Sequence, residues 1–348
     1  MTNIELINKL NTDGVLTKDE FLKILKTYTP DDLTYAQKLA VNISEKYFKK
    51  QIYIRGLIEF TNICKQDCFY CGLRCSNSKI ERYRLTDQQI LDCCETGNML
   101  GFKTFVLQGG EDPYFDDDKM CSLISEIKSK YPECAVTLSI GERSKNSYQK
   151  LFEAGADRYL LRHETANTEH YSKLHPKNLS LASRKQCLFD LKEVGFQTGC
   201  GFMVGSPYQT FETIAEDLLF IYELQPHMVG IGPFIPHKDT PFGDKPQGDL
   251  LLTLLLLALV RIMLKTVLLP STTALGTIAP DGREQGILSG ANVVMPNLSP
   301  TDVRKKYMLY NNKISTGSEA AEGLADLKCR LEKIGYSIAF TRGDYKTN

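Results

Sequence analysis

The feature that most constrains the fold is an alternation, from residue 51 onward, of short apolar runs with helix-like amphipathic stretches. Eight runs read as strands, at residues 51–60, 103–110, 134–141, 157–164, 196–205, 227–234, 266–275 and 291–296. Parallel strands need crossover helices, and eight strand–helix units in about 250 residues is the expected size of a (β/α)8 TIM-type barrel. A doubly wound open sheet is the alternative α/β fold. In both folds the chemistry lies at the carboxyl ends of the strands.

The regions on either side of this alternation differ from it. Residues 1–50 space their apolar side chains three and four apart, which predicts N-terminal helices interrupted at Pro30. The tail is polar, and its pattern predicts a short helical extension. We therefore expect three parts: an N-terminal helical segment over 1–50, the barrel over 51–300, and a C-terminal helical extension over 301–348 that closes the barrel.

Composition excludes several classes of protein. Lys plus Arg and Asp plus Glu both number 42, a balance that argues against a nucleic-acid-coating surface. The run LLLTLLLLALV at 250–260 is too short to span a bilayer, so it predicts a buried core helix and no membrane partner. The first ten residues lack the pattern of a signal peptide.

Eleven cysteines, an odd number, argue against a disulfide framework and for a reducing compartment, so we expect a cytoplasmic protein. Free cysteine behaves as a small hydrophobe. Six cysteines at apolar-patterned positions are therefore predicted to be packing residues: Cys93, Cys94, Cys121, Cys134, Cys187 and Cys200.

The stretch NICKQDCFYCGLRC at 62–75 holds Cys64, Cys68, Cys71 and Cys75 directly after the first predicted strand. Soft thiolates select iron–sulfur clusters or zinc. A structural zinc site needs four closed ligands, usually as two separated pairs, and the chain has no second C-x2-C pair. Three thiolates on one loop would instead ligate three irons of a [4Fe–4S] cluster and leave the fourth open. Cys75, beyond Gly72, is the alternative fourth ligand.

Polar residues and glycines follow nearly every predicted strand. Examples are QGGEDP at 108–113, LRHETAN at 161–167 and GIGPFIPH at 230–237. A barrel end with a purely structural role would not require this concentration. The sequence therefore predicts a reactive site at the carboxyl ends of the strands, next to the cysteine loop.

The spacing C-x3-C-x-Φ-C, with aromatic Tyr70 before the last cysteine, resembles the signature of the radical S-adenosylmethionine (SAM) superfamily. The resemblance implies that the open iron binds the amino and carboxylate groups of SAM. It also implies that the reduced cluster passes one electron to the sulfonium, which yields methionine and a 5′-deoxyadenosyl radical. The cofactors perform that chemistry, while the protein supplies orientation and a dry pocket.

A wider resemblance covers most of residues 50–310. The segments IEFTNICKQDCFYCGLR, LQGGEDPY, DRYLLRHETAN, GIGPFIPHKDTP, TTALGTI and GANVVMPN together resemble the [FeFe]-hydrogenase maturases of the HydE type. That family implies a role in assembling the diiron subcluster (H-cluster) of [FeFe]-hydrogenase. It also implies a small organometallic or amino-acid-derived substrate, a reductant such as ferredoxin or flavodoxin, and other hydrogenase maturases as candidate partners.

Two rival functions remain. Methylornithine synthase, like biotin synthase, is a related radical SAM enzyme, and its barrel resembles much of the same sequence. An iron–sulfur electron carrier without SAM chemistry is the alternative from another class. A carrier would not need a full barrel or polar residues at nearly every strand end.

The resemblance also implies roles for individual residues. Glycines at 109 and 110 would let the backbone approach the cofactor closely. Glu164 would bind ribose hydroxyls, and Arg184 would pair with the methionine carboxylate of SAM. The cofactor-binding set would be Tyr70, Gln108, Gly109, Gly110, Glu111, Thr137, Glu164, Arg184 and Met203. The substrate set would be Arg162, Thr272, Thr273 and Tyr307.

Several polar side chains near the predicted strand ends also have an ordinary structural interpretation. Glu111 could be a charge at a helix N-terminus, Arg184 a solvated helix residue, and Thr272 and Thr273 packing inside the barrel. His163 would face the helix layer, and His237 would be a loop residue without a chemical role.

One departure from the family pattern concerns the number of clusters. Some HydE-type maturases carry extra C-terminal cysteines that bind a second iron–sulfur cluster. Here residues 311–348 contain only Cys329, and one thiol cannot hold a [2Fe–2S] cluster. We therefore expect one [4Fe–4S] cluster, ligated by three cysteines, and no second C-terminal cluster.

Overall fold

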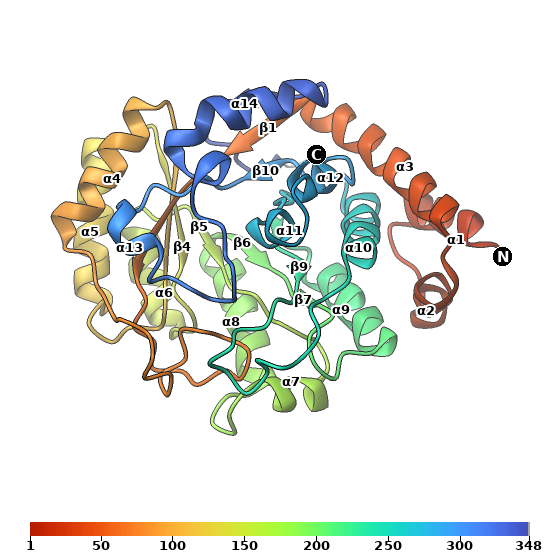
Figure 1. Cartoon of the computed structure of the whole chain (residues 1–348), viewed down its shortest axis with the longest axis horizontal. Helices are drawn as coiled ribbons and strands as arrows, with labels where there is room; N and C mark the ends of the chain where they lie inside the picture. Colours follow the sequence, from red (N-terminus) through yellow and green to blue (C-terminus); the bar gives the residue numbers. More distant parts are fainter. Residues whose placement is uncertain (347–348) are drawn as a thin grey trace.

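A closed parallel barrel forms the centre of the computed structural model, which describes residues 1–346 (Figure 1). The first strand is interrupted at Arg55 and consists of β1 (Gln51–Ile54) and β2 (Gly56–Thr61). From β2 the sheet continues through β3 (Thr104–Gly109), β4 (Ala135–Ser139), β5 (Arg158–Leu160), β6 (Gln197–Cys200) and β8 (Met228–Val229). Bridges at Leu268 and Pro270 then lead to β10 (Val293–Val294), which pairs with β1. The ring closes on itself, which confirms the predicted (β/α)8 barrel.

Several strands are shorter than predicted. The segments 196–205 and 227–234 each divide at a glycine, and their second parts, β7 (Met203–Val204) and β9 (Gly232–Pro233), pair with each other. Gly201 has φ +152°, outside the range that most strand residues adopt. Of the predicted strand 266–275, only isolated bridges form, because helix α11 begins at Thr273. These breaks lie on the carboxyl side of the barrel.

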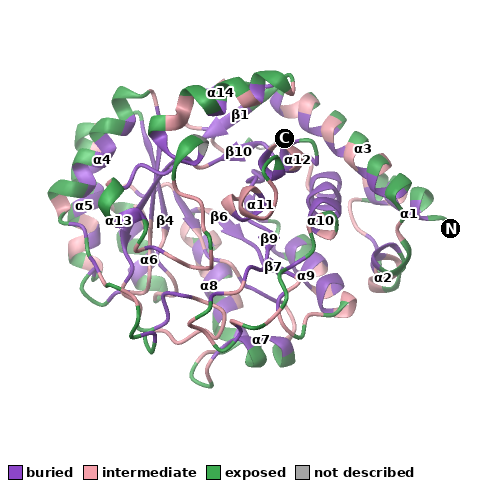
Figure 2. Cartoon of the chain, in the orientation of Figure 1, coloured by how far each residue is buried: buried purple, intermediate pink, exposed green. Residues whose placement is uncertain are grey.

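Helices surround the barrel, and each strand-to-strand crossover contributes to this layer. The long crossover helices are α4 (Asp87–Met99), α5 (Asp117–Lys130), α6 (Lys145–Glu153), α8 (Leu181–Val194), α9 (Phe211–Leu224) and α10 (Leu250–Met263). Shorter helices are α7 (Thr168–Leu174), α11 (Thr273–Ile278), α12 (Gly282–Ile287) and α13 (Thr301–Arg304). Figure 2 shows buried residues in the strands and on the inward helix faces, with exposed residues outside. This is the burial pattern of an α/β barrel.

The apolar run at 250–260 lies in α10, where every residue from Thr253 to Met263 is buried. The prediction of a core helix is therefore confirmed. Among the helices that the structure describes, none combines the length and apolar character needed to cross a membrane.

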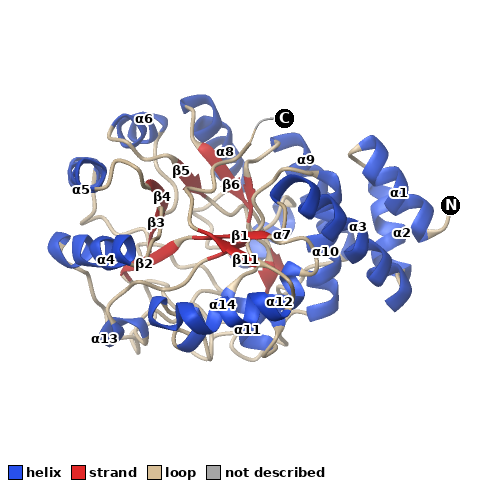
Figure 3. Ribbon diagram, turned by 90° about the horizontal axis from the view of Figure 1, so that it is seen from above, coloured by secondary structure: helices blue, strands red, loops and turns tan. Residues whose placement is uncertain are grey.

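The N-terminal segment folds into α1 (Asn3–Asp13), α2 (Lys18–Thr27) and α3 (Pro30–Phe48). Each begins with a threonine whose side chain completes a capping box, at Thr2, Thr17 and Thr29. Figures 1 and 3 show these helices outside the ring, with α3 packed against α10 and α2 against α9. The division of the chain at residues 50 and 300 stays a prediction.

The C-terminal segment contains 3₁₀ turns η1 (Gly317–Glu319) and η2 (Ala321–Gly323), helix α14 (Leu324–Lys333) and strand β11 (Ser337–Ala339). The tail was predicted as helical, but β11 is a parallel strand that pairs with β1. A run of three residues is too short for its period to be recognised in the sequence.

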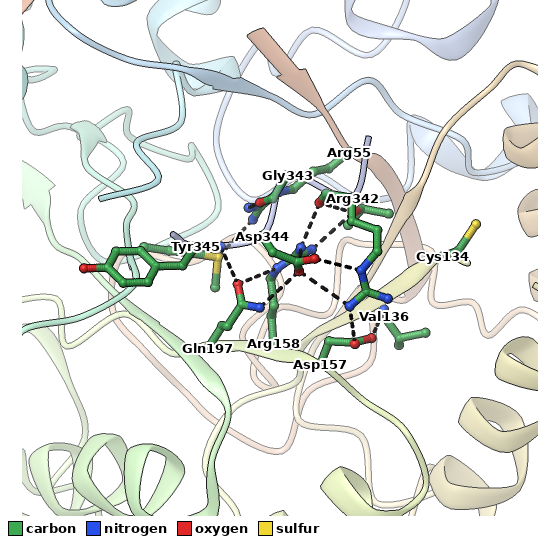
Figure 4. Close-up of polar contacts among 12 residues, drawn as sticks. Arg55, Cys134, Val136, Asp157, Arg158, Gln197, Arg342, Gly343, Asp344 and Tyr345 are labelled. Carbon is green, nitrogen blue, oxygen red and sulfur yellow. Dashed lines mark hydrogen bonds and ion pairs between the residues drawn. The ribbon is translucent and has the colours of Figure 1, made fainter. Parts of the chain in front are cut away.

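Residues after β11 cover the amino-terminal end of the barrel (Figure 4). Arg158, at the start of β5, is fully buried and forms an ion pair with Asp344. Arg342 bridges Asp344 and Asp157, with N–O distances of 2.8 and 2.6 Å. Arg55 is also buried and donates to the carbonyl of Gly343 at 3.5 Å. Charged residues thus occupy the amino-terminal end of the barrel, whereas the predicted site is at the carboxyl end.

Candidate functional site

The long loop between β2 and α4 carries the first four cysteines and is held in shape by arginines. The guanidinium of Arg82 donates hydrogen bonds of 2.6–3.2 Å to loop carbonyls, those of Asn62, Leu73, Arg74 and Asn77. Arg74 forms a bidentate pair with Asp67 at 2.7 and 2.6 Å, which lowers the pKa of that carboxyl. A planar guanidinium donates several hydrogen bonds in a fixed geometry, so these arginines can order a loop that has no regular secondary structure.

Cys64, Cys68 and Cys71 are half-buried in this loop, while Cys75 is exposed. Burial, followed by the charge of a neighbouring thiolate, raises the pKa of Cys68 and raises that of Cys71 to about 12. Among residues 1–346, no three His, Cys, Asp or Glu side chains form a site for a single metal ion. A [4Fe–4S] cluster has a different requirement, because each iron takes its own thiolate.

Two glycines allow the cysteine loop to lie close to its neighbours. A Cβ at Gly110, just after β3, would lie 2.2 Å from the carbonyl of Ile63 and 2.7 Å from the Cβ of Cys64. A Cβ at Gly72 would lie 2.1 Å from the carbonyl of Met308. Both contacts involve backbone, so a side chain at either position would displace the loop.

The carboxylates of Glu111 and Glu142 lie next to this loop. Glu111 accepts hydrogen bonds from the side chain of Gln66 at 2.7 Å and from the backbone of Glu142 at 3.2 Å. Arg184 on α8 donates to Glu142 at 2.5 Å and to the carbonyl of Arg162 at 3.0 Å. The buried Arg184 is therefore not a solvated helix residue, since it links α8 to the ends of two strands.

Glu164, four residues after β5, has an unusual backbone conformation. Its φ is +62°, a left-handed value that costs a non-glycine residue energy. Its amide donates to the carbonyl of Gly201 at 3.1 Å, and its Oε2 lies 3.3 Å from Nη2 of Arg162 without a hydrogen bond. Burial raises the pKa of this carboxyl against the opposing charges of Arg162 and Arg184. The carboxylate therefore keeps binding capacity inside the barrel.

A cavity of about 320 Å³ occupies the carboxyl end of the barrel lumen. The predicted site residues that line it are Tyr70, Cys71, Gln108, Gly109, Arg162, Glu164, Met203, Thr272, Thr273 and Tyr307. The Oγ1 of Thr272 is buried and has no hydrogen-bond partner among residues 1–346. Burial and the charge of Glu59 raise the pKa of Tyr307, so its hydroxyl stays protonated. The structure thus gathers substrate and cofactor candidates around one space.

The remaining predicted residues lie beside or below this cavity. Cys64, Cys68, Gly110, Glu111 and Arg184 belong to the layer that surrounds the cysteine loop. Thr137 lies two residues before Ser139, which lines the cavity, so it faces the lumen one layer deeper. Its Oγ1 is buried without a hydrogen bond.

Two charged residues that line the cavity, Glu59 and Lys313, were not predicted. Glu59 on β2 is fully buried and pairs with Nζ of Lys313 at 2.7 Å. Its other oxygen accepts a hydrogen bond from Asn297 at 2.8 Å. A carboxylate in the middle of the run GLIEFT is a signal that the sequence offered. The sequence around Lys313 did not indicate a place in the cavity, because this residue reaches the barrel from the C-terminal segment.

Residues outside the site agree with their structural interpretations. The ring of His163 lies against Phe220 at 5.0 Å, and its Nε2 is 3.4 Å from Asp217, so it faces helix α9 as predicted. Of the six cysteines predicted to be packing residues, Cys121 is half-buried and the other five are buried. His237 packs against Gly72, which places it behind the cysteine loop.

Comparisons with known proteins show the family of the chain. The model of the radical SAM superfamily matches residues 58–221. The [FeFe] hydrogenase maturase subunit HydE of Thermotoga maritima is 50% identical over 277 residues, which cover 80% of this chain and 79% of that protein. 3-Methylornithine synthase of Methanosarcina barkeri is 28% identical over 326 residues, which cover 93% of this chain and 91% of that protein.

Solved structures show the same architecture. Methylornithine synthase (PylB) superimposes with a TM-score of 0.85 at 26% identity, covering 96% of this chain and 97% of that one. The maturase HydG superimposes with a TM-score of 0.82 at 20% identity, covering 97% of this chain and 76% of that one, a likeness of fold alone. With half of its aligned residues shared with HydE over four-fifths of its length, this chain belongs to the radical SAM superfamily and, within it, to the family of the [FeFe]-hydrogenase maturase HydE.

Proposed function

We propose that this chain is a radical SAM enzyme that acts in assembly of the diiron subcluster, the H-cluster, of [FeFe]-hydrogenase. The observation that carries the proposal is the placement of the cysteine loop. Cys71 and Tyr70 line a cavity in the barrel lumen whose walls come from nearly every barrel strand. A lumen of this kind excludes water from a reactive intermediate.

The residues present fit a [4Fe–4S] cluster. The donor set is three soft thiols on one loop, and the backbone of Gly110 leaves room where any Cβ would meet Cys64. We propose that Cys64, Cys68 and Cys71 hold the cluster. When bound, the cluster and SAM together supply a 5′-deoxyadenosyl radical by reductive cleavage of SAM.

For SAM, the chain offers polar groups that the fold leaves unsatisfied beside the cluster loop. We propose that Glu164 binds the ribose, and that Gly109 and Gly110 give the backbone access that the amino acid part needs. Arg184 is already committed to Glu142, so it would bind the methionine carboxylate with the donors that this ion pair leaves free. Gln108, Glu111, Thr137 and Met203 complete the proposed set.

We propose that the substrate, a small organometallic or amino-acid-derived molecule, occupies the inner part of the cavity. Arg162 and Thr272 offer buried donors there that make no hydrogen bond within the described part of the chain. Thr273 and Tyr307 complete this wall. A ferredoxin- or flavodoxin-type reductant, contact with other maturases and a cytoplasmic location remain parts of the same proposal.

The number of clusters is also a proposal. Cys329, the only cysteine after residue 310, is exposed and alone. Cys75 is exposed too, and its backbone amide donates to the carbonyl of Gln66 in the same loop at 2.9 Å, so it is tested as a ligand as well. We propose one cluster with three cysteine ligands.

Electron paramagnetic resonance tests the proposal on anaerobically reconstituted, dithionite-reduced protein with and without SAM. We expect a cluster signal that shifts when SAM is added, and 5′-deoxyadenosine in the mixture. An unchanged signal without 5′-deoxyadenosine would contradict SAM chemistry and support the electron carrier.

A second experiment separates the two enzymes. The chain is added to an anaerobic mixture that contains apo-[FeFe]-hydrogenase and the other maturases. Activation that depends on the chain is the expected result. Formation of 3-methylornithine without activation would instead favour the synthase.

A further inference from the structure

Helix α7 ends against the cysteine loop, and the two segments are joined at two points. The backbone amide of Phe69 donates to the carbonyl of Leu174 at 3.0 Å. One residue further along each segment, the hydroxyl of Tyr70 lies 3.1 Å from Nε2 of His175. Tyr70 is the aromatic residue that directly precedes Cys71 and lines the cavity.

The direction of the second bond follows from the other nitrogen of the ring. Nδ1 of His175 lies 3.0 Å from the backbone carbonyl of Tyr171. A carbonyl can only accept, so Nδ1 must carry the hydrogen. In a neutral imidazole Nε2 is then an acceptor, and the hydroxyl of Tyr70 donates to it.

The ring of His175 is held in this orientation. It stacks on Tyr171, with centroids 3.9 Å apart and an interplanar angle of 21°. Against Tyr70 it makes an edge contact at 5.4 Å and 88°. The residue is 1% exposed, and burial, followed by the charge of Arg184, lowers the pKa of the imidazole to about 3. The neutral form therefore persists throughout the physiological range.

We propose that His175 is a positioning residue for SAM binding, because its ring fixes the hydroxyl of Tyr70 and thereby holds the aromatic wall of the cavity beside Cys71. This inference rests on the proposed function, since it assigns a role toward the cofactor. His175 does not touch the cavity, and it acts through Tyr70 alone. A ring held in one rotamer loses less entropy when a ligand packs on it.

The tautomer is tested first, on the apoprotein, by nitrogen-15 NMR of the five histidines. We expect His175 to carry its hydrogen on Nδ1, and its Nε2 resonance to shift in Tyr70→Phe. The variant His170→Phe is the matched control. His170 lies on the same helix and is 2% exposed, but its Nε2 contacts the carbonyl of Pro207. A hydrogen on Nε2 of His175 would overturn the proposal.

A double-mutant cycle then measures SAM affinity from the shift of the cluster signal. Loss of one hydrogen bond predicts about three- to tenfold weaker binding in Tyr70→Phe and in His175→Phe. The double variant should lose no more than Tyr70→Phe alone, since both single variants remove the bond between Tyr70 and His175. All of these variants should bind as much iron per chain as the wild type. The control variant His170→Phe should also bind SAM with wild-type affinity.

The outcomes separate this inference from the proposed function. Wild-type affinity in both single variants, or losses that multiply in the double variant, would overturn the role of His175 while SAM binding stands. Tyr70→Phe removes only a hydroxyl, so it tests the bond even if His175→Phe folds poorly. A wild-type protein that fails to respond to SAM would instead contradict the proposed function itself.

Discussion

Asp344 provides a direct test of how the C-terminal tail stabilises the barrel. Its carboxylate accepts hydrogen bonds from Arg158, Arg342 and Gln197 at the amino-terminal end of the lumen (Figure 4). Burial lowers the pKa of Arg158, and the charge of Asp344 partly offsets that effect. Replacing Asp344 with asparagine keeps the shape of the side chain but leaves the buried guanidinium without its counter-ion.

The magnitude follows from the pKa of Asp344. Burial alone would raise that pKa, but the hydrogen bond from Arg342 and the charge of Arg158 lower it from 3.8 to about 2. A difference of that size corresponds to roughly 2–2.5 kcal/mol. Because 38% of the side chain is exposed, solvent screening reduces the expected loss in Asp344→Asn to about 1–2 kcal/mol. For 348 residues this lowers the melting temperature by about 1–3 °C.

The assay is thermal unfolding of the apoprotein at several pH values. The folded pKa of Asp344 is lowered, so its stabilisation is complete above pH 3.8 and is lost as the pH falls toward 2. The difference between wild type and Asp344→Asn should therefore be largest near pH 7 and shrink below pH 4. Asp13→Asn, at an exposed site, should change stability by less than about 0.5 kcal/mol. A difference that stays constant down to pH 2 would refute the electrostatic explanation.

Three further predictions concern the cavity end. Cys71→Ser should lose most of its iron after anaerobic reconstitution, whereas Cys75→Ser should keep it; equal iron in both would contradict the three-cysteine site. Gly110→Ala should also bind less iron, because the added Cβ would collide with the backbone of the cysteine loop. An unchanged iron content would show that the loop can move. Lys313→Met leaves Glu59 buried without its ion-pair partner and should cost about 3–5 kcal/mol in apoprotein unfolding. Adding Glu59→Gln should recover most of that loss.

The barrel could be predicted from the sequence because each strand–helix unit carries its own periodic signal. The breaks in its later strands could not. Gly201 and the glycines near 230 permit conformations that a strand lacks, but a glycine in a β-like run does not say whether the strand bends or ends. The strand β11 was not predicted for another reason: its partner β1 lies almost the whole length of the chain away in sequence.

The site residues also fall into those that the sequence predicts and those that only the fold reveals. The cysteine loop and the residues after the strands are local motifs, so the sequence could place Cys71, Gly109 and Glu164 near one another. Lys313 and His175 are different, because their partners lie 254 and 105 residues away along the chain. Only the folded arrangement shows that a lysine from the tail neutralises Glu59. The same holds for a histidine at the end of a helix and the tyrosine of the cysteine loop.

The lumen itself explains why stability and chemistry can be tested separately. Arg158 lies four residues before Arg162, which is roughly 13 Å of extended chain. Between them lies Leu160, which lines the cavity together with Leu57 on β2, a strand separated from β5 by β3 and β4. The charges that bind the tail are therefore separated from the cavity by apolar side chains. It follows that Asp344→Asn should unfold more easily and yet bind SAM with wild-type affinity, whereas Tyr70→Phe should weaken SAM binding.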